Sequence, residues 1–345
     1  MTEIADDTTT ADQALRHLRT GGSLLWTGDF HNGRQLLKAV DRRLAGRKRR
    51  TPAPQDAATQ FLRQRAERAE RADVLGRVLV ELGEDLSLDL RRAPDARDAC
   101  RHAYGTAGPR TVPFTELQGV LGAWQWHRRG VWVEELGDRV YPDYGVFSPT
   151  RSEYVGLVAG LAGDADRVAG RGVLEIGTGT GVLAAVLARH GASVTATDVS
   201  PRAVECARRN LERLGCDARV VEADLWPEAH RADVVVFNPP WLPGTPTSDL
   251  ELGIYDAGSG ALRRYLAGLA DHLTDGGEGW LVLSDLAEHL GLRTREQLEG
   301  WIADGGLRVL GREDTAPRHP KVRDADDPLH VARSREVTSL WRLGA

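Results

Sequence analysis

Cysteine and methionine are scarce in this chain of 345 residues, which holds three cysteines and one methionine. Cys100, Cys206 and Cys216 do not stand at metal-binding spacings, and three cysteines are too few for a disulfide framework. We therefore expect a protein of a reducing compartment, the cytoplasm, with no metal site.

Long apolar runs are also missing, and none approaches the roughly 20 residues that a membrane-spanning helix needs. The first ten residues are acidic and rich in threonine, which is not the composition of a signal peptide. We expect residues 1–10 to form a disordered tail, and we expect no membrane partner.

Neither sign of charge dominates, because 45 Lys and Arg stand against 50 Asp and Glu, a net charge of −5. Residues 1–150 carry 23 basic and 21 acidic side chains (+2), whereas residues 151–345 carry 22 and 29 (−7). A nucleic-acid enzyme would need a local basic patch, and Arg42–Arg50, with six basic residues of nine, is a candidate. This run fits either a phosphate contact or a solvated helix end whose cations complement the helix dipole. Nucleic acid is therefore a possible partner, but not the favoured one.

The chain divides where its pattern becomes regular. Residues 11–128 mix helical and strand-like segments without a recognisable chemical motif, and they predict a mixed α/β accessory or substrate domain. Residues 129–150 predict a hairpin and a connector. From residue 151 to 345 strands and helices alternate, which predicts a doubly wound α/β catalytic domain.

A strand followed by two prolines is the most informative stretch. Val234–Phe237 has the composition of a buried strand, and Asn238-Pro239-Pro240-Trp241 ends it because proline cannot donate to a sheet. The Asn238 side chain and backbone carbonyls then lie at the carboxyl end of a strand, where open α/β sheets bind ligands. Such acceptors suit a planar nitrogen, although a plain turn after a core strand has the same pattern.

A glycine-rich turn follows an earlier predicted strand, Val173–Ile176, and reads Gly177-Thr178-Gly179-Thr180-Gly181. Glycines let the backbone approach a ligand, and the next helix offers free N–H groups. Nicotinamide and flavin enzymes share this kind of turn. Glu175, two residues before the first glycine, favours a ligand with a positively charged amino-acid part over a pyrophosphate.

Two further acids follow predicted strands. Asp198 can accept both hydroxyls of a ribose, although it could instead cap the helix that begins near Pro201. Asp224 can accept from an adenine amino group, although an ordinary loop aspartate is the alternative.

These four motifs, in this order, resemble those of the class I S-adenosylmethionine-dependent methyltransferases over roughly residues 140–345. The resemblance implies S-adenosylmethionine as the cofactor. It also implies a Rossmann-like sheet of seven strands in the order 3-2-1-4-5-7-6, preceded here by the mixed α/β domain.

Within that class the chain is similar to the Asn-Pro-Pro-aromatic group of N-methyltransferases. This group includes protein-glutamine methyltransferases acting on release factors, ribosomal RNA guanine-N2 enzymes and adenine-N6 enzymes. The segment from Val140 to Glu153 is similar to the one before the catalytic domain of the glutamine enzymes. The resemblance implies methylation of a guanidinium or amide nitrogen on a small molecule or protein side chain, such as arginine or glutamine. An exocyclic amine of ribosomal RNA is the alternative.

The resemblance also assigns roles to residues. Trp241 would stack on the planar group that receives the methyl. The catalytic residues would be Asn238, Pro239, Pro240 and Trp241. The cofactor would contact Glu175, Gly177, Thr178, Gly179, Thr180, Gly181, Asp198, Val199, Asp224, Leu225 and Asn238. The substrate would contact Phe147, Thr150, Asn238, Pro239, Trp241 and Tyr255.

Overall fold

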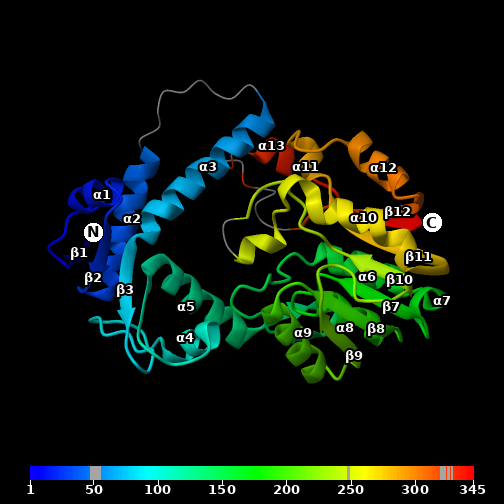
Figure 1. Ribbon diagram of the computed structural model, residues 1–345, viewed down its shortest axis with the longest axis horizontal. Coiled ribbons are helices and arrows are strands. Elements are labelled where there is room, and N and C mark those ends of the chain that lie inside the picture. Colours follow the sequence, from blue (N-terminus) through cyan, green and yellow to red (C-terminus); the bar gives the residue numbers. More distant parts are fainter. Residues whose placement is uncertain (47–55, 247–248, 319–323, 325–326, 328) are drawn as a thin grey trace. The chain divides into compact units, whose positions relative to one another are not determined.

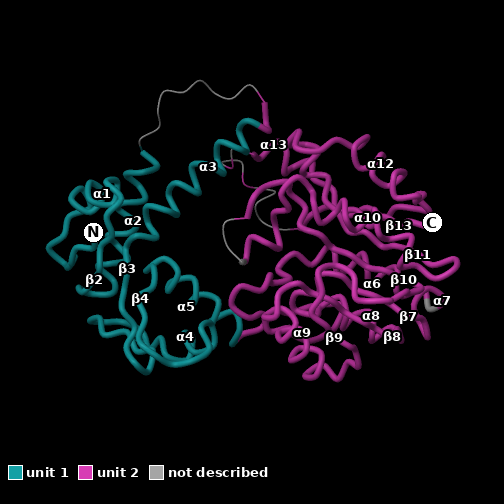
Figure 2. The backbone as a smooth tube through the Cα atoms, in the orientation of Figure 1, with its two compact units in different colours: residues 1–55, 59–128 teal, residues 56–58, 129–345 magenta. Residues whose placement is uncertain are grey.

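The computed structural model describes residues 1–46, 56–246, 249–318, 324, 327 and 329–345. The chain forms two compact units (Figure 2): unit 1 comprises residues 1–55 and 59–128, and unit 2 comprises residues 56–58 and 129–345. Over the described residues, no helix has both the length and the hydropathy required to cross a bilayer.

Unit 1 is a four-stranded sheet with helices (Figure 1). Its strands follow the order β1-β2-β3-β4, of which the first three are parallel and β4 is antiparallel to β3. Its elements are β1 (Thr2–Ala5), α1 (Ala11–Arg19), β2 (Ser23–Trp26), α2 (Phe30–Gly46), α3 (Ala57–Gly76), β3 (Val78–Leu82), α4 (Arg97–Tyr104), β4 (Arg110–Pro113) and α5 (Phe114–Arg129).

The prediction that residues 1–10 are a disordered tail is wrong. Residues Thr2–Ala5 pair in parallel with Ser23–Trp26 as an edge strand. The polar residues that follow form specific local bonds: Asp6 accepts from the N–H of Thr8, and Thr10 forms a capping box with Gln13 at the start of α1. The acidic, threonine-rich composition therefore reflects turn and cap chemistry rather than disorder.

The first five residues of the basic run, 42–46, lie in α2. Arg43 pairs with Asp12, with 2.6 Å between Nε and Oδ1. Residues 47–50 lie outside the described part of the chain, so the predicted phosphate contact at Arg42–Arg50 stays a prediction.

Unit 2 is a seven-stranded sheet with helices on both faces, preceded by an antiparallel hairpin of β5 and β6 (Figure 1). Its elements are β5 (Val131–Val133), η1 (Glu134–Leu136), β6 (Asp138–Val140), α6 (Glu153–Ala162), α7 (Ala165–Val168), β7 (Gly172–Ile176), α8 (Val182–Arg189), β8 (Ser193–Asp198), α9 (Pro201–Arg213), β9 (Ala218–Glu222), β10 (Ala232–Phe237), η2 (Asp249–Gly253), η3 (Ala257–Ser259), α10 (Gly260–His272), β11 (Leu273–Ser284), α11 (Leu286–His289), α12 (Arg295–Asp304), β12 (Arg308–Thr315), α13 (His330–Arg333) and β13 (Thr338–Gly344).

The sheet has the expected strand order. It runs β9-β8-β7-β10-β11-β13-β12, which is 3-2-1-4-5-7-6 when the seven strands are numbered along the chain. Strands β7 to β11 pair in parallel, and β13 is antiparallel to both of its neighbours. The order reverses between β7 and β10, and ligands of open α/β sheets bind at such a reversal.

Alternate residues of the central strands enter two separate hydrophobic cores. Val234 and Val236 pack with helices α6, α8 and α9, whereas Val235 and Phe237 pack with α10 and α12. The side-chain period of two along a strand makes both faces apolar, as a sheet covered on both sides requires. The strand ends are thereby held in place, and the site lies at their carboxyl edge.

Candidate active site

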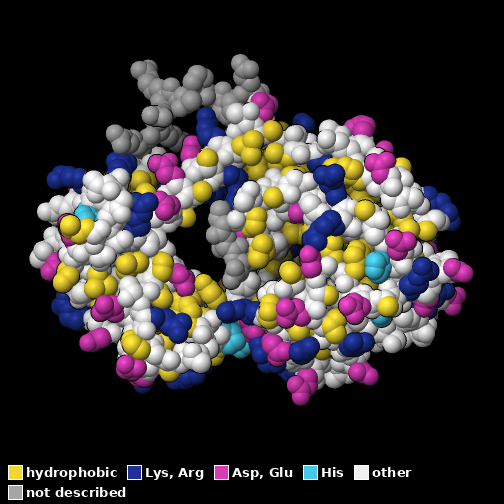
Figure 3. Space-filling model, viewed as in Figure 1, with side chains coloured by type: hydrophobic (Ala, Val, Ile, Leu, Met, Phe, Trp, Pro, Cys, Tyr) yellow, Lys and Arg dark blue, Asp and Glu magenta, His cyan; other side chains and the backbone are white. Residues whose placement is uncertain are grey.

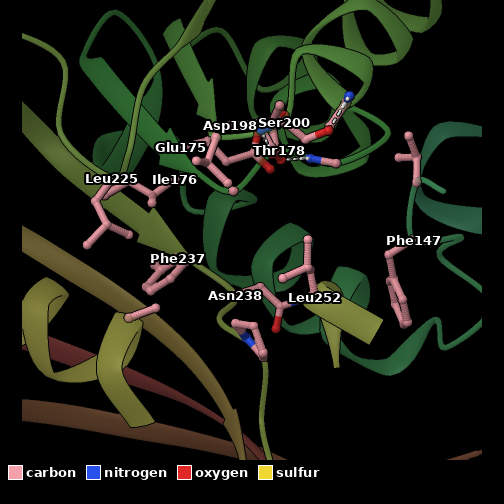
Figure 4. Close-up of a pocket in the computed structure, with 18 of the residues that line it drawn as sticks. Phe147, Glu175, Ile176, Thr178, Asp198, Ser200, Leu225, Phe237, Asn238 and Leu252 are labelled. Carbon is pink, nitrogen blue, oxygen red and sulfur yellow. Dashed lines mark hydrogen bonds between the residues drawn. The ribbon is translucent and has the colours of Figure 1, made fainter. Parts of the chain in front are cut away.

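A cavity of about 560 Å³ opens at the carboxyl ends of β7, β8, β9 and β10. Figure 4 shows Glu175, Thr178 and Asp198 grouped on one side of this cavity, with Asn238 and Leu252 facing them. Four parallel strands thus contribute their following loops to one space.

The glycine-rich turn shapes one wall of the cavity. Gly177, Gly179 and Gly181 all adopt positive φ angles, of 68°, 55° and 80°. A Cβ on Gly181 would lie 3.2 Å from the backbone of Ala207 in α9, and a Cβ on Gly177 would lie 3.4 Å from Phe237. The glycines therefore serve both the left-handed turn and the close approach of the neighbouring elements.

Glu175 lies beneath this turn and is 1% exposed. Its Oε2 accepts from the hydroxyl of Thr178 at 2.6 Å. Burial raises the pKa of the Glu175 carboxyl to about 7, and the nearby Asp198 charge acts in the same direction, while the Thr178 bond opposes both. A cationic group placed beside Glu175 would favour its ionised form.

Asp198 ends β8 and is oriented by the backbone. Its Oδ2 accepts from the N–H of Gly179 and its Oδ1 from the N–H of Ser200, each at 2.9 Å. Burial nevertheless raises the pKa of Asp198 above its ordinary value. Ser200, rather than Asp198, caps α9 by accepting from the N–H of Ala203. Carboxylate oxygens accept more than one bond, so Asp198 can still meet two hydroxyls.

The carboxylate of Asp224 binds Arg264, a residue that belongs to none of the sequence motifs. Its two oxygens accept from Nη1 and Nη2 of Arg264 in α10, at 2.8 and 2.9 Å. The bond to Arg264 lowers the pKa of Asp224. Both side chains line the cavity, so an adenine amino group would share Asp224 with Arg264.

Asn238 follows β10 and lines the cavity, but Trp241 does not. The indole Nε1 of Trp241 donates to Oδ1 of Asn238 at 2.8 Å, and the Arg151 guanidinium lies over the indole at 4.6 Å from its centre. The indole of Trp241 thus contacts Asn238 and Arg151, and the predicted stacking of Trp241 on substrate stays a prediction.

The cavity brings together most of the predicted site. Among the described residues its lining includes Phe147, Glu175, Gly177, Thr178, Gly179, Thr180, Asp198, Val199, Asp224, Leu225, Asn238, Pro240 and Tyr255. It leaves out Thr150, Gly181, Pro239 and Trp241. Gly181 contributes through its packing on Ala207, and Pro239 is buried beside Asn238.

Sequence reasoning missed several lining residues, among them Asp256 and Arg264. Asp256 accepts from the N–H groups of Ala261 and Leu262 and so caps α10. An acid a few residues before an apolar helix was a signal for that cap. Arg264 has no comparable signal, because only the fold brings it to Asp224.

The chemistry of the lining suits S-adenosylmethionine. Among the described residues it holds four acids, Glu175, Asp198, Asp224 and Asp256, against one base, Arg264. A buried carboxylate can meet a cationic amino-acid part, and the glycine turn leaves room for a close backbone approach. Asp198 would hold the ribose, and Asp224 with Arg264 would flank the adenine.

A Rossmann-like sheet with this cavity is typical of an enzyme that binds a nucleoside-type cofactor. The profile described as "Methyltransferase small domain" matches residues 139–298. A release factor glutamine methyltransferase of Xylella fastidiosa is 34% identical over 223 residues, which span 60% of this chain and 74% of that one. The chain belongs to the class I S-adenosylmethionine-dependent methyltransferases, in the group of N-methyltransferases.

Two other relatives cover shorter regions. A ribosomal RNA small subunit methyltransferase C of Alcanivorax borkumensis is 34% identical over 44% of each chain. A putative protein N5-glutamine methyltransferase of Methanocaldococcus jannaschii is 31% identical over 34% of this chain and 64% of that one. This chain thus spans less than two thirds of either relative.

Proposed function

We propose that this enzyme methylates the side-chain amide nitrogen of glutamine in a protein substrate. The observation that carries the proposal is Asn238 at the rim of an acidic, cofactor-sized cavity. Relatives named as glutamine methyltransferases support it, including the one of which this chain covers 74%. Such a substrate is consistent with a cytoplasmic enzyme, and the cysteines of the described chain are free thiols.

The arrangement favours an amide over a guanidinium. A substrate guanidinium would gain from stacking on Trp241, because cations bind the faces of aromatic rings. Arg151 of the chain itself already lies over that ring. Trp241 also packs against both hydrophobic cores of unit 2. Stacking on Trp241 therefore gives no specific support for an arginine substrate. The acceptors that an amide N–H needs, Asn238 Oδ1 and the Pro239 carbonyl, remain.

The chain's part in the reaction is positioning. S-adenosylmethionine supplies a methyl group bound to a positively charged sulfur. Asn238 Oδ1 has a second lone pair beside its bond to Trp241, and with the Pro239 carbonyl it would accept the two N–H groups of the amide. This directs the nitrogen lone pair toward the methyl. The nitrogen held by these two acceptors would take the methyl as its bond to sulfur breaks, and the cationic nitrogen would then release a proton to solvent. Fixed acceptors stabilise the charge that develops.

The test is to incubate the purified enzyme and methyl-labelled cofactor with a protein extract, ribosomal RNA, and free amino acids. Proteolytic digestion of the labelled product and mass spectrometry of its peptides should identify N5-methylglutamine. The Asn238→Ala variant should lower turnover at least 100-fold while it still binds cofactor, as judged by calorimetry. Methylarginine or label in free amino acids would refute the amide in a protein.

Methylation of ribosomal RNA is the second candidate, supported by the relative named ribosomal RNA small subunit methyltransferase C. On the face shown in Figure 3, basic and acidic side chains are interspersed. An RNA substrate would place label in nucleosides, and its affinity would fall steeply with salt.

A further inference from the structure

A network of polar and aromatic side chains holds the Asn-Pro-Pro-Trp segment from outside the cavity. Asn238 meets the indole of Trp241, and the indole lies against the guanidinium of Arg151. Arg151 in turn donates from Nε to Glu153 at 2.7 Å and from Nη2 to Glu336 at 2.9 Å. A chain of contacts thus connects Glu336 through Arg151 and Trp241 to the predicted acceptor.

The bond between Trp241 and Asn238 determines which way the amide faces. An indole N–H is only a donor, so the atom that it meets at 2.8 Å must be the amide oxygen. If the amide rotated by half a turn, its NH₂ would face the indole N–H, and two donors would oppose each other. The indole therefore keeps Oδ1 of Asn238 in one place and keeps its Nδ2 out of that place. An oxygen held in this way is oriented in advance for a substrate N–H.

Arg151 is anchored more firmly than a surface arginine. The side chains of Glu153 and Glu336 have no exposed area, and that of Arg151 is 19% exposed. Oε1 of Glu336 also accepts from the Ser284 hydroxyl at 2.7 Å. Ser284 ends β11, which is the neighbour of β10 in the sheet. The guanidinium is thus bound to the start of α6 and to the edge of the sheet from which Asn238 emerges.

We propose that Arg151 and Trp241 are positioning residues that hold Oδ1 of Asn238 toward the nitrogen that receives the methyl. This inference rests on the proposed function only in that Asn238 is the acceptor of that nitrogen. Trp241 acts through its N–H, and Arg151 acts through the face of the indole. A planar substrate group does not stack on Trp241.

The kinetic test uses Trp241→Phe, which keeps an aromatic face but removes the N–H, and Arg151→Gln, which removes the cation. Each variant should lower kcat about 10- to 100-fold, because a misplaced catalytic group loses rate steeply. KM for the acceptor and the dissociation constant of S-adenosylmethionine should change less than about threefold. The double variant should be no slower than the worse single variant, because both changes release the same acceptor.

Arg312→Gln is the matched control. Arg312 also lies over a tryptophan, Trp341, at 5.1 Å, but the indole N–H that meets Asn238 belongs to Trp241. The kcat of Arg312→Gln should equal that of the unmodified enzyme. The inference would be overturned if the losses in kcat of the two single variants multiplied in the double variant. An unchanged kcat in Trp241→Phe would also overturn it.

A second measurement needs no methyl acceptor. In protein labelled with ¹⁵N tryptophan, the indole signal absent from Trp241→Phe identifies residue 241 among the nine tryptophans. We expect its N–H to exchange with solvent at least tenfold faster in Asn238→Ala and in Arg151→Gln. If the exchange is faster in both variants but no amide is methylated, the proposed glutamine substrate is refuted while the positioning role stands. An indole that exchanges equally fast in the unmodified enzyme overturns the positioning role even if glutamine is methylated.

Discussion

Glu175 and Asp198 differ from surface acids because each has lost most of its water. For Glu175 the loss is nearly complete, and its pKa rises to about 7. Burial also raises the pKa of Asp198, and the backbone N–H groups of Ser200 and Gly179 partly offset this rise. The part of the cavity beside Glu175 therefore changes its charge near neutral pH, although the titrating group is a carboxyl.

We predict that S-adenosylmethionine binds about tenfold more weakly at pH 6 than at pH 8. The free enzyme holds a proton on Glu175 below a pKa of about 7, and a cationic amino group favours the ionised form, so binding must release that proton. Calorimetry in buffers of different ionisation enthalpy will show the release. In Glu175→Gln both the proton release and this pH dependence should vanish, and their persistence would remove Glu175 from the cofactor site.

Asp224 and Arg264 provide a test at the rim of the same cavity. Their bidentate pair is exposed, so we expect little effect on stability from Arg264→Gln. If Arg264 restrains Asp224 beside the adenine, the variant should change cofactor affinity by about two- to tenfold and leave the melting temperature within about 2 °C. If Arg264→Gln binds the cofactor as tightly as the unmodified enzyme, the pair has no part in cofactor binding.

At the scale of elements, the site depends on how closely α8 approaches α9. Gly181 precedes α8, and its missing side chain lets Ala207 of α9 pack against the turn. The same backbone conformation, with φ near 80°, is strained for other residues. The glycine-rich turn thus packs against α9 at Gly181 and lines the cavity at residues 177–180.

Gly181→Ala should destabilise unit 2 by roughly 1–3 kcal/mol and weaken cofactor binding. Gly160→Ala is the matched control, because Gly160 lies in α6 with nothing within 4 Å of an added Cβ. This control should be neutral or stabilise by about 0.5–1 kcal/mol. Thermal unfolding with and without cofactor will measure both, and equal melting curves for the two variants would contradict the packing role.

At the scale of the whole molecule, the cavity at the strand ends belongs to one unit. The described residues that line it run from Gly145 to Arg264, all within unit 2. Unit 1 has its own sheet and its own buried side chains, such as Trp26, Phe30 and Phe114. We infer that unit 1 acts on substrate choice and not on cofactor binding.

Residues 129–345 produced alone should bind S-adenosylmethionine within about threefold of the full chain, while methylation of the protein substrate should fall at least tenfold. Calorimetry measures the first and label incorporation the second. Circular dichroism must first show that the fragment is folded. A folded fragment that loses cofactor affinity would show that unit 1 completes the cofactor site.

The strands and the residues at their carboxyl ends could be predicted from the sequence alone, whereas the strand order was predicted from the resemblance to the class I methyltransferases. Strand composition, the glycine turn and the prolines after Phe237 are local signals, and parallel strands bring their following loops to one edge. Glu175, Asp198 and Asn238 could therefore be placed in one site without coordinates. The edge strand Thr2–Ala5 could not, because its polar flanks also fit a disordered tail.

The partners of these residues, in contrast, depend on the tertiary structure. Arg264 reaches Asp224 across 40 positions, and Arg151 reaches Glu336 across 185. No local pattern encodes such pairs, because they depend on how helices lie on the sheet. The same reason applies to Trp241. Its place in the Asn-Pro-Pro-Trp motif predicts stacking on a substrate, but the fold brings its indole to Asn238 and Arg151.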